Sequence, residues 1–366
     1  MKILVKNSGK TESVYQSNII FKAEIMGYTD KSPLYFSQTQ DGKKIYSTYE
    51  AVELYQKGLV DAIVLPDGIA LNLLRRMIDE FVGLGVKRED LLIIKPSSRS
   101  DYTFVNSKDY TRLEYIELHV VDHCNLNCKG CVHFSPLVPE SKFVEYDRMR
   151  NDLIQLRKKV EIVDRIHILG GEPLLNQELH RFVRLVREVY PFSDISIVTN
   201  GLLIEKMTEE LVSAIIDTNT WINISVYLPI ANEISEKARS LISKGIKVRF
   251  TDTITKFAVP LDMKGGHAKG VRNINCHCPN LYEGKLAVCP IICYMPYFNN
   301  YFGLDMDAED GLIDIYNENL TYEELVNELH RVRKTCDKCL YVSREDCVER
   351  KWEQSQKKKR ISDYSI

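Results

Sequence analysis

Three cysteines stand close together in one short stretch of the sequence. Cys124, Cys128 and Cys131 lie in VDHCNLNCKGCVHFSP, residues 121–136, with no fourth cysteine beside them. A closed zinc site uses four protein ligands, so these thiols leave one coordination position without a ligand from the motif. Either a distant residue completes the site, or something else binds there. These cysteines are the candidate metal-binding and catalytic residues.

The other cysteines are also clustered. The chain has ten in all: three at 124–131, four at 276–293 and three at 336–347. The N-terminal MKILVKNSGK has too short an apolar run for a secretory signal, and no stretch approaches the about 18 apolar residues of a membrane span. We therefore expect a cytoplasmic protein, in which thiols stay reduced and serve as metal ligands rather than as disulfides.

Composition limits the classes of partner. The 366 residues are 44% hydrophobic and 27% charged, with a formal net charge of -2, as in a soluble globular protein with more than one core. This charge gives no reason to expect nucleic acid or a membrane as partner. The KKKR run at 357–360 is interpreted as a solvated tail.

Strand-like runs alternate with helical patterns over about the first 260 residues, which predicts an α/β fold with β-α-β crossovers and a parallel sheet or barrel. Near the N-terminus, NSGK at 7–10 carries only Gly9 of a dinucleotide-binding fingerprint, so a Rossmann-like unit is indicated only loosely. The expected strands are 2–5, 61–66, 91–96, 115–121, 165–169, 195–199, 222–227 and 247–251, and the expected helices are 70–82, 176–190, 205–216 and 232–244.

Beyond residue 260 the alternation stops, and only a helix over 321–333, opened by the capping pair Thr321 and Glu324, is expected. A loop-rich segment with seven cysteines is better stabilised by metal than by a large core. The predicted domains are 1–105 (small α/β), 106–262 (barrel), 263–350 (cysteine-rich) and 351–366 (polar tail).

Cys124-x3-Cys128-x2-Cys131, placed directly after a predicted strand, resembles the cysteine loop of the radical S-adenosylmethionine (SAM) family. The resemblance implies a partial (β/α)6 barrel and a [4Fe–4S] cluster held by the three thiolates. SAM would bind the fourth iron and be cleaved reductively to a 5′-deoxyadenosyl radical. One departure is Gly130, where family members usually have an aromatic residue; His133 or Phe134 could stack on the adenine instead.

Further residues resemble the family's cofactor-binding positions. Gly170, Gly171 and Glu172 match its GGE motif, which implies that Glu172 accepts a hydrogen bond from the methionyl amine. Thr199-Asn200-Gly201 resembles its ribose- and methionine-contacting turn, although an ordinary turn without a cofactor contact accounts for these residues nearly as well. Asn223 and Ser225 share one face of a strand and could point into a barrel lumen or face solvent.

The second cysteine region resembles the SPASM and twitch extensions, which carry auxiliary [4Fe–4S] clusters. Gly284-x4-Cys289 and Cys336-x2-Cys339 carry the resemblance, and it implies one auxiliary cluster on Cys278, Cys289, Cys336 and Cys339. Structural zinc could use the same thiolates. Cys276, Cys293 and Cys347 remain alternative ligands.

The resemblance implies a radical SAM oxidoreductase that removes hydrogen from a small polar substrate, such as a sugar or a nucleotide-linked sugar. The auxiliary cluster would accept the remaining electron, and a flavodoxin or ferredoxin would donate the first. A radical SAM peptide maturase and a zinc-stabilised binding protein without activity are the alternatives. Candidates for a general base are Arg249, Asp252, Lys256 and Tyr227.

Overall fold

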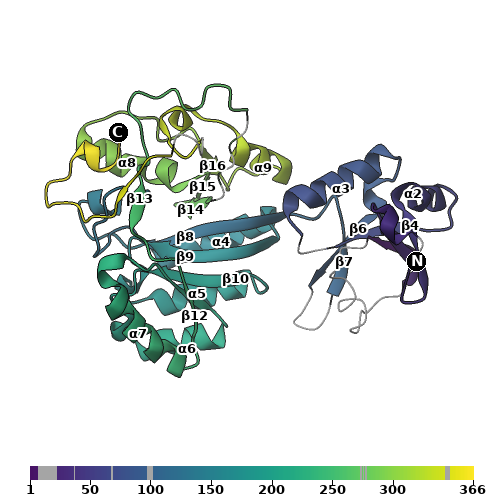
Figure 1. The fold of residues 1–366 in the computed structure, drawn as a ribbon, viewed down its shortest axis with the longest axis horizontal. Helices are drawn as coiled ribbons and strands as arrows, with labels where there is room; N and C mark the ends of the chain where they lie inside the picture. Colours follow the sequence, from purple (N-terminus) through teal and green to yellow (C-terminus); the bar gives the residue numbers. More distant parts are fainter. Residues whose placement is uncertain are drawn as a thin grey trace. The chain divides into compact units, whose positions relative to one another are not determined.

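The computed structural model describes residues 1–6, 23–36, 38–66, 69–96, 102–272, 274, 276, 278–342 and 347–366. It divides the chain into two compact units, Met1–Glu114 and Tyr115–Ile366 (Figure 1). The NSGK turn and residues 97–101 of the predicted linker lie outside the described residues.

The first unit is an α/β sheet, as its alternating pattern predicts. The inner strands pair in parallel, and β3 and β7 run antiparallel at the two edges, in the order β3-β4-β2-β1-β5-β6-β7. The strands are β1 (Lys2–Lys6), β2 (Glu24–Asp30), β3 (Thr39–Gln40), β4 (Lys43–Ser47), β5 (Ala62–Leu65), β6 (Leu91–Pro96) and β7 (Tyr102–Asn106).

The helices of this unit follow from their local sequences. A capping box of Ser47 and Glu50 opens α2 (Thr48–Gln56). The apolar face predicted over 70–82 forms α3 (Leu71–Gly83), which buries Leu74, Ile78 and Phe81. Short 3₁₀ turns lie at Pro33–Tyr35 and Arg88–Asp90.

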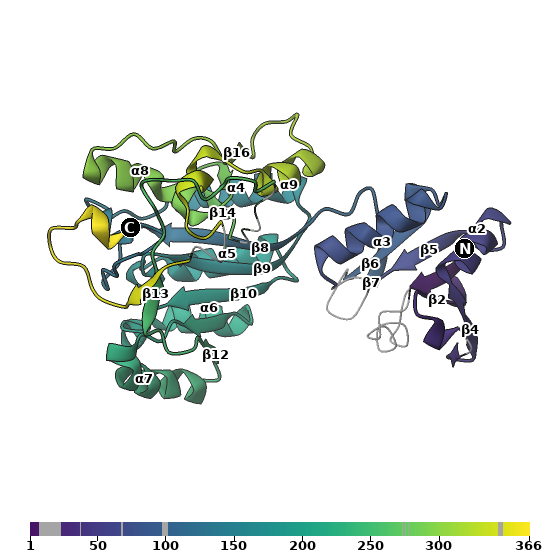
Figure 2. The same ribbon diagram turned by 45° about the horizontal axis from the view of Figure 1, so that its top comes forward.

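The second unit contains an eight-stranded sheet in the order β12-β11-β10-β9-β8-β14-β15-β16 (Figures 1 and 2). Strands β9 to β12 pair in parallel and in chain order, which confirms the predicted α/β class. The described strands form an open sheet, in which β14 pairs with β8 in parallel. The strands are β8 (Arg112–Val121), β9 (Ile162–Gly170), β10 (Asp194–Thr199), β11 (Trp221–Ile224), β12 (Lys247–Phe250), β14 (Asn280–Tyr282), β15 (Lys285–Ala287) and β16 (Leu312–Asp314).

Amphipathic helices connect these strands and pack their apolar faces on the sheet. The face predicted for α5 (Leu179–Val189) is buried through Phe182, Leu185 and Val186. The remaining connecting helices are α4 (Tyr146–Lys159), α6 (Glu209–Asp217) and α7 (Ala231–Ser243), with 3₁₀ turns at Ser135–Leu137, Pro173–Leu175, Ile204–Lys206 and Leu228–Ile230.

The part beyond residue 260 has more helix than its sequence predicts. The expected capping box opens α9 (Tyr322–His330), and η7 (Lys334–Lys338) follows it. An unexpected helix, α8 (Pro290–Phe302), buries Tyr294, Met295 and Phe298 in the core of this region. Because α8 is apolar on most sides, it lacks the amphipathic period that marks a surface helix.

The C-terminal segment folds back onto the molecule. Strand β17 (Glu349–Lys351) pairs antiparallel with β13 (Lys256–Ala258), and the 3₁₀ turn η9 (Ile361–Asp363) follows. Trp352 and Tyr364 are 7% and 0% exposed. The KKKR run at 357–360 stays mostly at the surface, as its interpretation as a solvated run expects, whereas the residues on either side of it pack onto the rest of this unit. We call residues 349–365 the strap.

Within the described part of the chain, no helix combines the length and the apolar character that crossing a bilayer requires.

Candidate functional site

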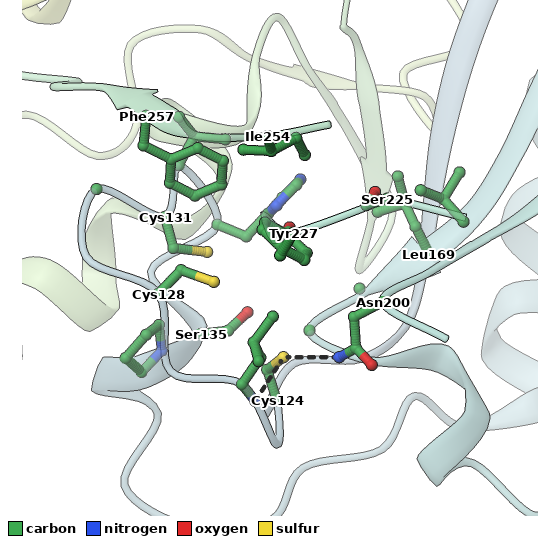
Figure 3. A pocket seen from close by; sticks show the side chains of 18 of the residues that line it. Cys124, Cys128, Cys131, Ser135, Leu169, Asn200, Ser225, Tyr227, Ile254 and Phe257 are labelled. Carbon is green, nitrogen blue, oxygen red and sulfur yellow. Dashed lines mark hydrogen bonds between the residues drawn. The ribbon is translucent and has the colours of Figure 1, made fainter. Parts of the chain in front are cut away.

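The three cysteines of the first cluster line one cavity of about 340 Å³. The cysteine loop leaves the end of β8, and the turns that follow β9 and β10 border the cavity beside it. Figure 3 shows the sulfur atoms of Cys128 and Cys131 directed into the space near Tyr227 and Phe257. Among the lining residues these are the only cysteines, so the predicted shortage of a fourth thiol holds for this cavity.

The strap holds the cysteine loop from outside the cavity. The Lys129 amide donates to the Glu353 carbonyl at 3.0 Å, and the Ser355 amide donates to the Asn127 carbonyl at 2.8 Å. Trp352 packs with Leu126 and Cys128 in one apolar cluster. The loop is thus fixed by residues far away in the sequence, for which the local motif gives no signal.

The two glycines of the GGE motif lie against the first residues of the cysteine loop. The Gly171 amide donates to the Val121 carbonyl at 2.8 Å. A Cβ on Gly170 would lie 2.0 Å from the Val121 oxygen, and one on Gly171 would lie 2.1 Å from the His123 oxygen. Both positions therefore require glycine, because main chain meets main chain here. Both glycines also line the cavity.

Glu172 is fully buried and is not among the residues that line the cavity. Its carboxylate accepts hydrogen bonds from the Thr199 hydroxyl at 2.6 Å, the Asn200 amide at 2.9 Å and the Leu174 amide at 3.1 Å. Burial raises the pKa of Glu172 to about 7, although these hydrogen bonds lower it. In this structure the carboxylate therefore supports the neighbouring turn.

Thr199 and Asn200, which the sequence suggests as cofactor-binding residues, line the cavity. The side-chain nitrogen Nδ2 of Asn200 donates to the side-chain oxygen of Asn125 at 2.7 Å. The same nitrogen lies 3.9 Å from the Cys124 sulfur (Figure 3). This links the turn after β10 to the cysteine loop. Asn125 was not predicted, although its place next to Cys124 made it a possible candidate.

Ser225 and Asn223 have different surroundings. Ser225 lines the cavity, and its amide donates to the Thr199 carbonyl at 2.9 Å. Asn223 does not line the cavity, and its side-chain nitrogen Nδ2 lies 3.5 Å from Nε2 of His167. The structure thus brings Ser225, but not Asn223, to the cavity.

The position before the third cysteine has an unexpected neighbour. A Cβ on Gly130 would lie 3.2 Å from the Ala258 oxygen and 3.9 Å from Cβ of Phe257. Phe257 lines the cavity, whereas Phe134 is fully buried in the core against Phe298. Phe134 is therefore not available at the cavity, and Phe257 provides an aromatic wall near Gly130.

His133 also lines the cavity, between two titratable groups. Its ring lies 3.5 Å from the Glu117 carboxylate and is hydrogen-bonded to the Cys131 thiol. Burial lowers the pKa of His133, but these two partners outweigh it and raise the value to about 9. Burial likewise opposes ionisation of Cys131, yet His133 lowers the pKa of that thiol overall. The arrangement favours the Cys131 thiolate.

Polar side chains continue from Glu117 along the same face of the sheet. The Tyr115 hydroxyl donates to Glu117 at 2.7 Å and lies 2.7 Å from Nδ1 of His167. Burial lowers the pKa of His167. Of the four candidate bases only Tyr227 lines the cavity; Arg249 pairs with Asp194, and Asp252 and Lys256 are exposed.

In the second cysteine region, four thiols influence one another's ionisation: Cys276, Cys289, Cys336 and Cys339. Burial raises the pKa of Cys276 to about 12, with contributions from Cys339 and Cys336. Burial also raises the pKa of Cys289, and Cys276, Cys339 and Cys336 add to this effect. Burial raises the pKa of Cys278, one of the ligands expected from the sequence, and Glu117 and Cys276 add to this effect; Cys278 is exposed.

The remaining cysteines lie elsewhere. Cys293 is buried in the core on α8, and Cys347 is exposed. Among the residues that the structure describes, no three Cys, His, Asp or Glu side chains are placed to hold a single metal ion.

Comparison with known proteins agrees with this geometry. Residues 118–229, which contain the cysteine loop, the GGE motif and the turn after β10, match the model of the radical SAM superfamily. This chain contains a radical SAM domain. The GTP 3′,8-cyclase of Lactiplantibacillus plantarum is 34% identical over 122 residues, and that of Aliarcobacter butzleri 31% over 107 residues. These matches cover 32% and 28% of this chain and only about a third, 35% and 32%, of the relatives.

Solved structures resemble the chain more distantly. BtrN in complex with AdoMet and 2-DOIA is 18% identical, with a TM-score of 0.41, over 63% of this chain and 94% of BtrN. Streptococcus suis SuiB bound to S-adenosylmethionine is 17% identical, with a TM-score of 0.31, over 38% of this chain and 34% of SuiB.

Proposed function

We propose that the protein is a radical SAM enzyme that removes a hydrogen atom from a small polar substrate. The observation that carries the proposal is the convergence of Cys124, Cys128 and Cys131, with no other cysteine, on one cavity bordered by the GGE glycines. Three thiolates fit a [4Fe–4S] cluster with one open iron. When bound, this cluster holds SAM and supplies the electron that cleaves it to the 5′-deoxyadenosyl radical.

The residues of the chain would prepare the site for this chemistry. His133 stabilises the Cys131 thiolate that the cluster requires. Asn200 fixes Asn125 next to Cys124. Leu169, Ile254 and Phe257 give the cavity an apolar wall that keeps water from a reactive radical.

The cofactor-binding roles follow the lining of the cavity. Gly170, Gly171, Thr199, Asn200 and Ser225 would contact SAM directly, because they border the space beside the thiols. Glu172 and Asn223 would act through neighbouring residues without touching SAM. Glu172 would fix the Thr199–Asn200 turn, and Asn223 would orient His167.

For the auxiliary [4Fe–4S] cluster we propose the ligands Cys276, Cys289, Cys336 and Cys339. Cys336 and Cys339 contribute to the raised pKa of Cys276 and of Cys289, whereas Glu117 and Cys276 contribute to that of Cys278. This difference supports the set without Cys278. Four cysteine ligands leave no open iron, so such a cluster would accept the substrate's electron rather than bind the substrate. The net reaction would then be an oxidation.

A small polar substrate is also supported by the curated relatives, whose name gives GTP as the molecule acted on. A sugar or a nucleotide-linked sugar remains the proposed class. A flavodoxin or ferredoxin is the proposed electron donor, because cleavage of SAM needs one electron from outside the protein.

The test is anaerobic reconstitution with iron and sulfide, followed by addition of SAM and dithionite. The protein should bind about eight irons per chain, in two [4Fe–4S] clusters, and form 5′-deoxyadenosine. A Cys128→Ala variant should lose this product and about half of the iron. A Cys347→Ser variant is the matched control, because its thiol is exposed and lines no described cavity. Wild-type protein that binds iron but never forms 5′-deoxyadenosine would contradict the proposal.

A further inference from the structure

A basic hollow lies on the outer side of the cysteine loop. Its volume is about 330 Å³. Residues 350–360 of the strap include six basic residues and one acidic residue, and four of them line the hollow: Arg350, Lys351, Glu353 and Arg360. The charged residues that line it are Lys129, Arg350, Lys351, Arg360, Glu353 and Asp363.

The positive charge of the hollow exceeds the negative charge. Both lining carboxylates lie near Lys129, with Glu353 at 2.7 Å and Asp363 at 3.9 Å from its ammonium nitrogen. Arg350 donates to the carbonyl oxygens of Ser362 and Ser365 in the strap. Lys351 and Arg360 are exposed. With four basic and two acidic lining residues, the hollow therefore presents a net positive surface to solvent.

The hollow and the cavity of the three cysteines share a wall. Gly130 and Phe257 line both spaces. Gly130 has φ of +73°, and a side chain there would press on the Ala258 carbonyl at 3.2 Å. One glycine and one aromatic ring thus stand between the positive surface and the space into which Cys128 and Cys131 point.

We propose that this hollow is the docking surface for a strongly acidic one-electron donor protein of the flavodoxin class. The inference rests on the proposed function, because only an enzyme with a reducible cluster at the three cysteines needs such a donor. The donor would lose one electron and the cluster would gain it across the wall of Gly130 and Phe257, with no atom transferred. Opposite charges would steer the encounter and orient the donor toward this wall.

The test compares two electron donors in anaerobic stopped-flow measurements of cluster bleaching. The variant Lys351→Glu/Arg360→Glu reverses two exposed charges of the hollow. The control Lys158→Glu/Lys244→Glu makes the same change of charge at exposed lysines that do not line it. With an acidic flavodoxin hydroquinone at low salt, the first variant should be reduced about tenfold more slowly than wild type, and added salt should shrink the difference.

The second donor is photoreduced 5-deazariboflavin, which is small and uncharged. It should reduce wild type and both variants at equal rates, which shows that the cluster and the fold are intact. The docking surface would be overturned if the Lys351→Glu/Arg360→Glu variant were slowed equally with both donors or were not slowed with flavodoxin. It would also be overturned if flavodoxin reduced the control variant equally slowly. Wild-type protein with no cluster that deazariboflavin can bleach would overturn the proposed function, and the docking surface with it.

Discussion

Glu172 is a buried carboxylate at which a hydroxyl and two main-chain amides are directed. Its ordinary pKa is 4.5, and burial raises the value to about 7. The folded protein therefore binds more protons than the unfolded chain between these values. The stability from this group is present at low pH and is lost as the pH rises through about 7.

A Glu172→Gln variant keeps the shape but removes this titration. In the metal-free wild type, ionisation of Glu172 should lower the free energy of unfolding by up to about 1 kcal/mol per pH unit between about pH 5 and 7. The variant should lack this decrease. Denaturant titrations under reducing conditions at several pH values measure this slope. The exposed Glu188→Gln serves as control. Equal slopes for all three proteins would mean that Glu172 ionises at its ordinary pKa.

The choice between Cys276 and Cys278 is a second question at this scale. Cys276→Ser should lower the iron content from about eight to about four per chain, whereas Cys278→Ser should leave it unchanged. Iron and sulfide analysis after anaerobic reconstitution measures both variants in parallel. The opposite result would restore the ligand set expected from the sequence.

The local motifs of the first site place its residues at one edge of the sheet. Cys124, the GGE glycines and Asn200 lie where their positions after successive strands indicate, since the ends of parallel strands meet at one edge of a sheet. Sequence spacing could not separate Cys276 from Cys278, because the two are only two residues apart. The proposed choice of Cys276 rests on its burial and on the contributions of Cys336 and Cys339 to its raised pKa.

At the scale of elements, the strap is the feature that periodicity could not reveal. Its charges resemble those of a solvated tail, yet Trp352 is buried against Leu126 and Cys128. Helix α8 was not predicted because it is apolar on most sides, which hides a helical period, and because it contains Pro296. Elements with alternating apolar faces, such as α3 and α5, lie within a few residues of their predicted limits.

Trp352 should be the residue through which the strap stabilises the cysteine loop. Trp352→Ala should lower the free energy of unfolding by about 3–5 kcal/mol, the usual cost of removing a buried aromatic side chain. It should also speed the loss of iron in air, since the loop would lose its outer support. Trp352→Phe, which retains a ring, should lose less of both. Denaturant unfolding and the rate of iron release measure the two effects; an alanine variant as stable as wild type would contradict this role.

At the scale of the molecule, alternating strands and helices sufficed to predict two α/β parts and a parallel sheet. They could not predict that β14, β15 and β16 extend the sheet beyond β8. These strands have three residues each, too few to show an alternating pattern. Their pairing depends on β8, more than 150 residues earlier in the chain (Asn280 pairs with Glu117).

The contact of Ser355 with Asn127 spans 228 residues. During synthesis the cysteine loop therefore emerges long before the segment that covers it, and contacts between such distant residues form late in folding. In that interval the thiols face solvent from the side that the strap later closes. Delivery of iron and sulfide would be easiest then, and a mature chain that had lost its cluster would have to release the strap before it could be repaired.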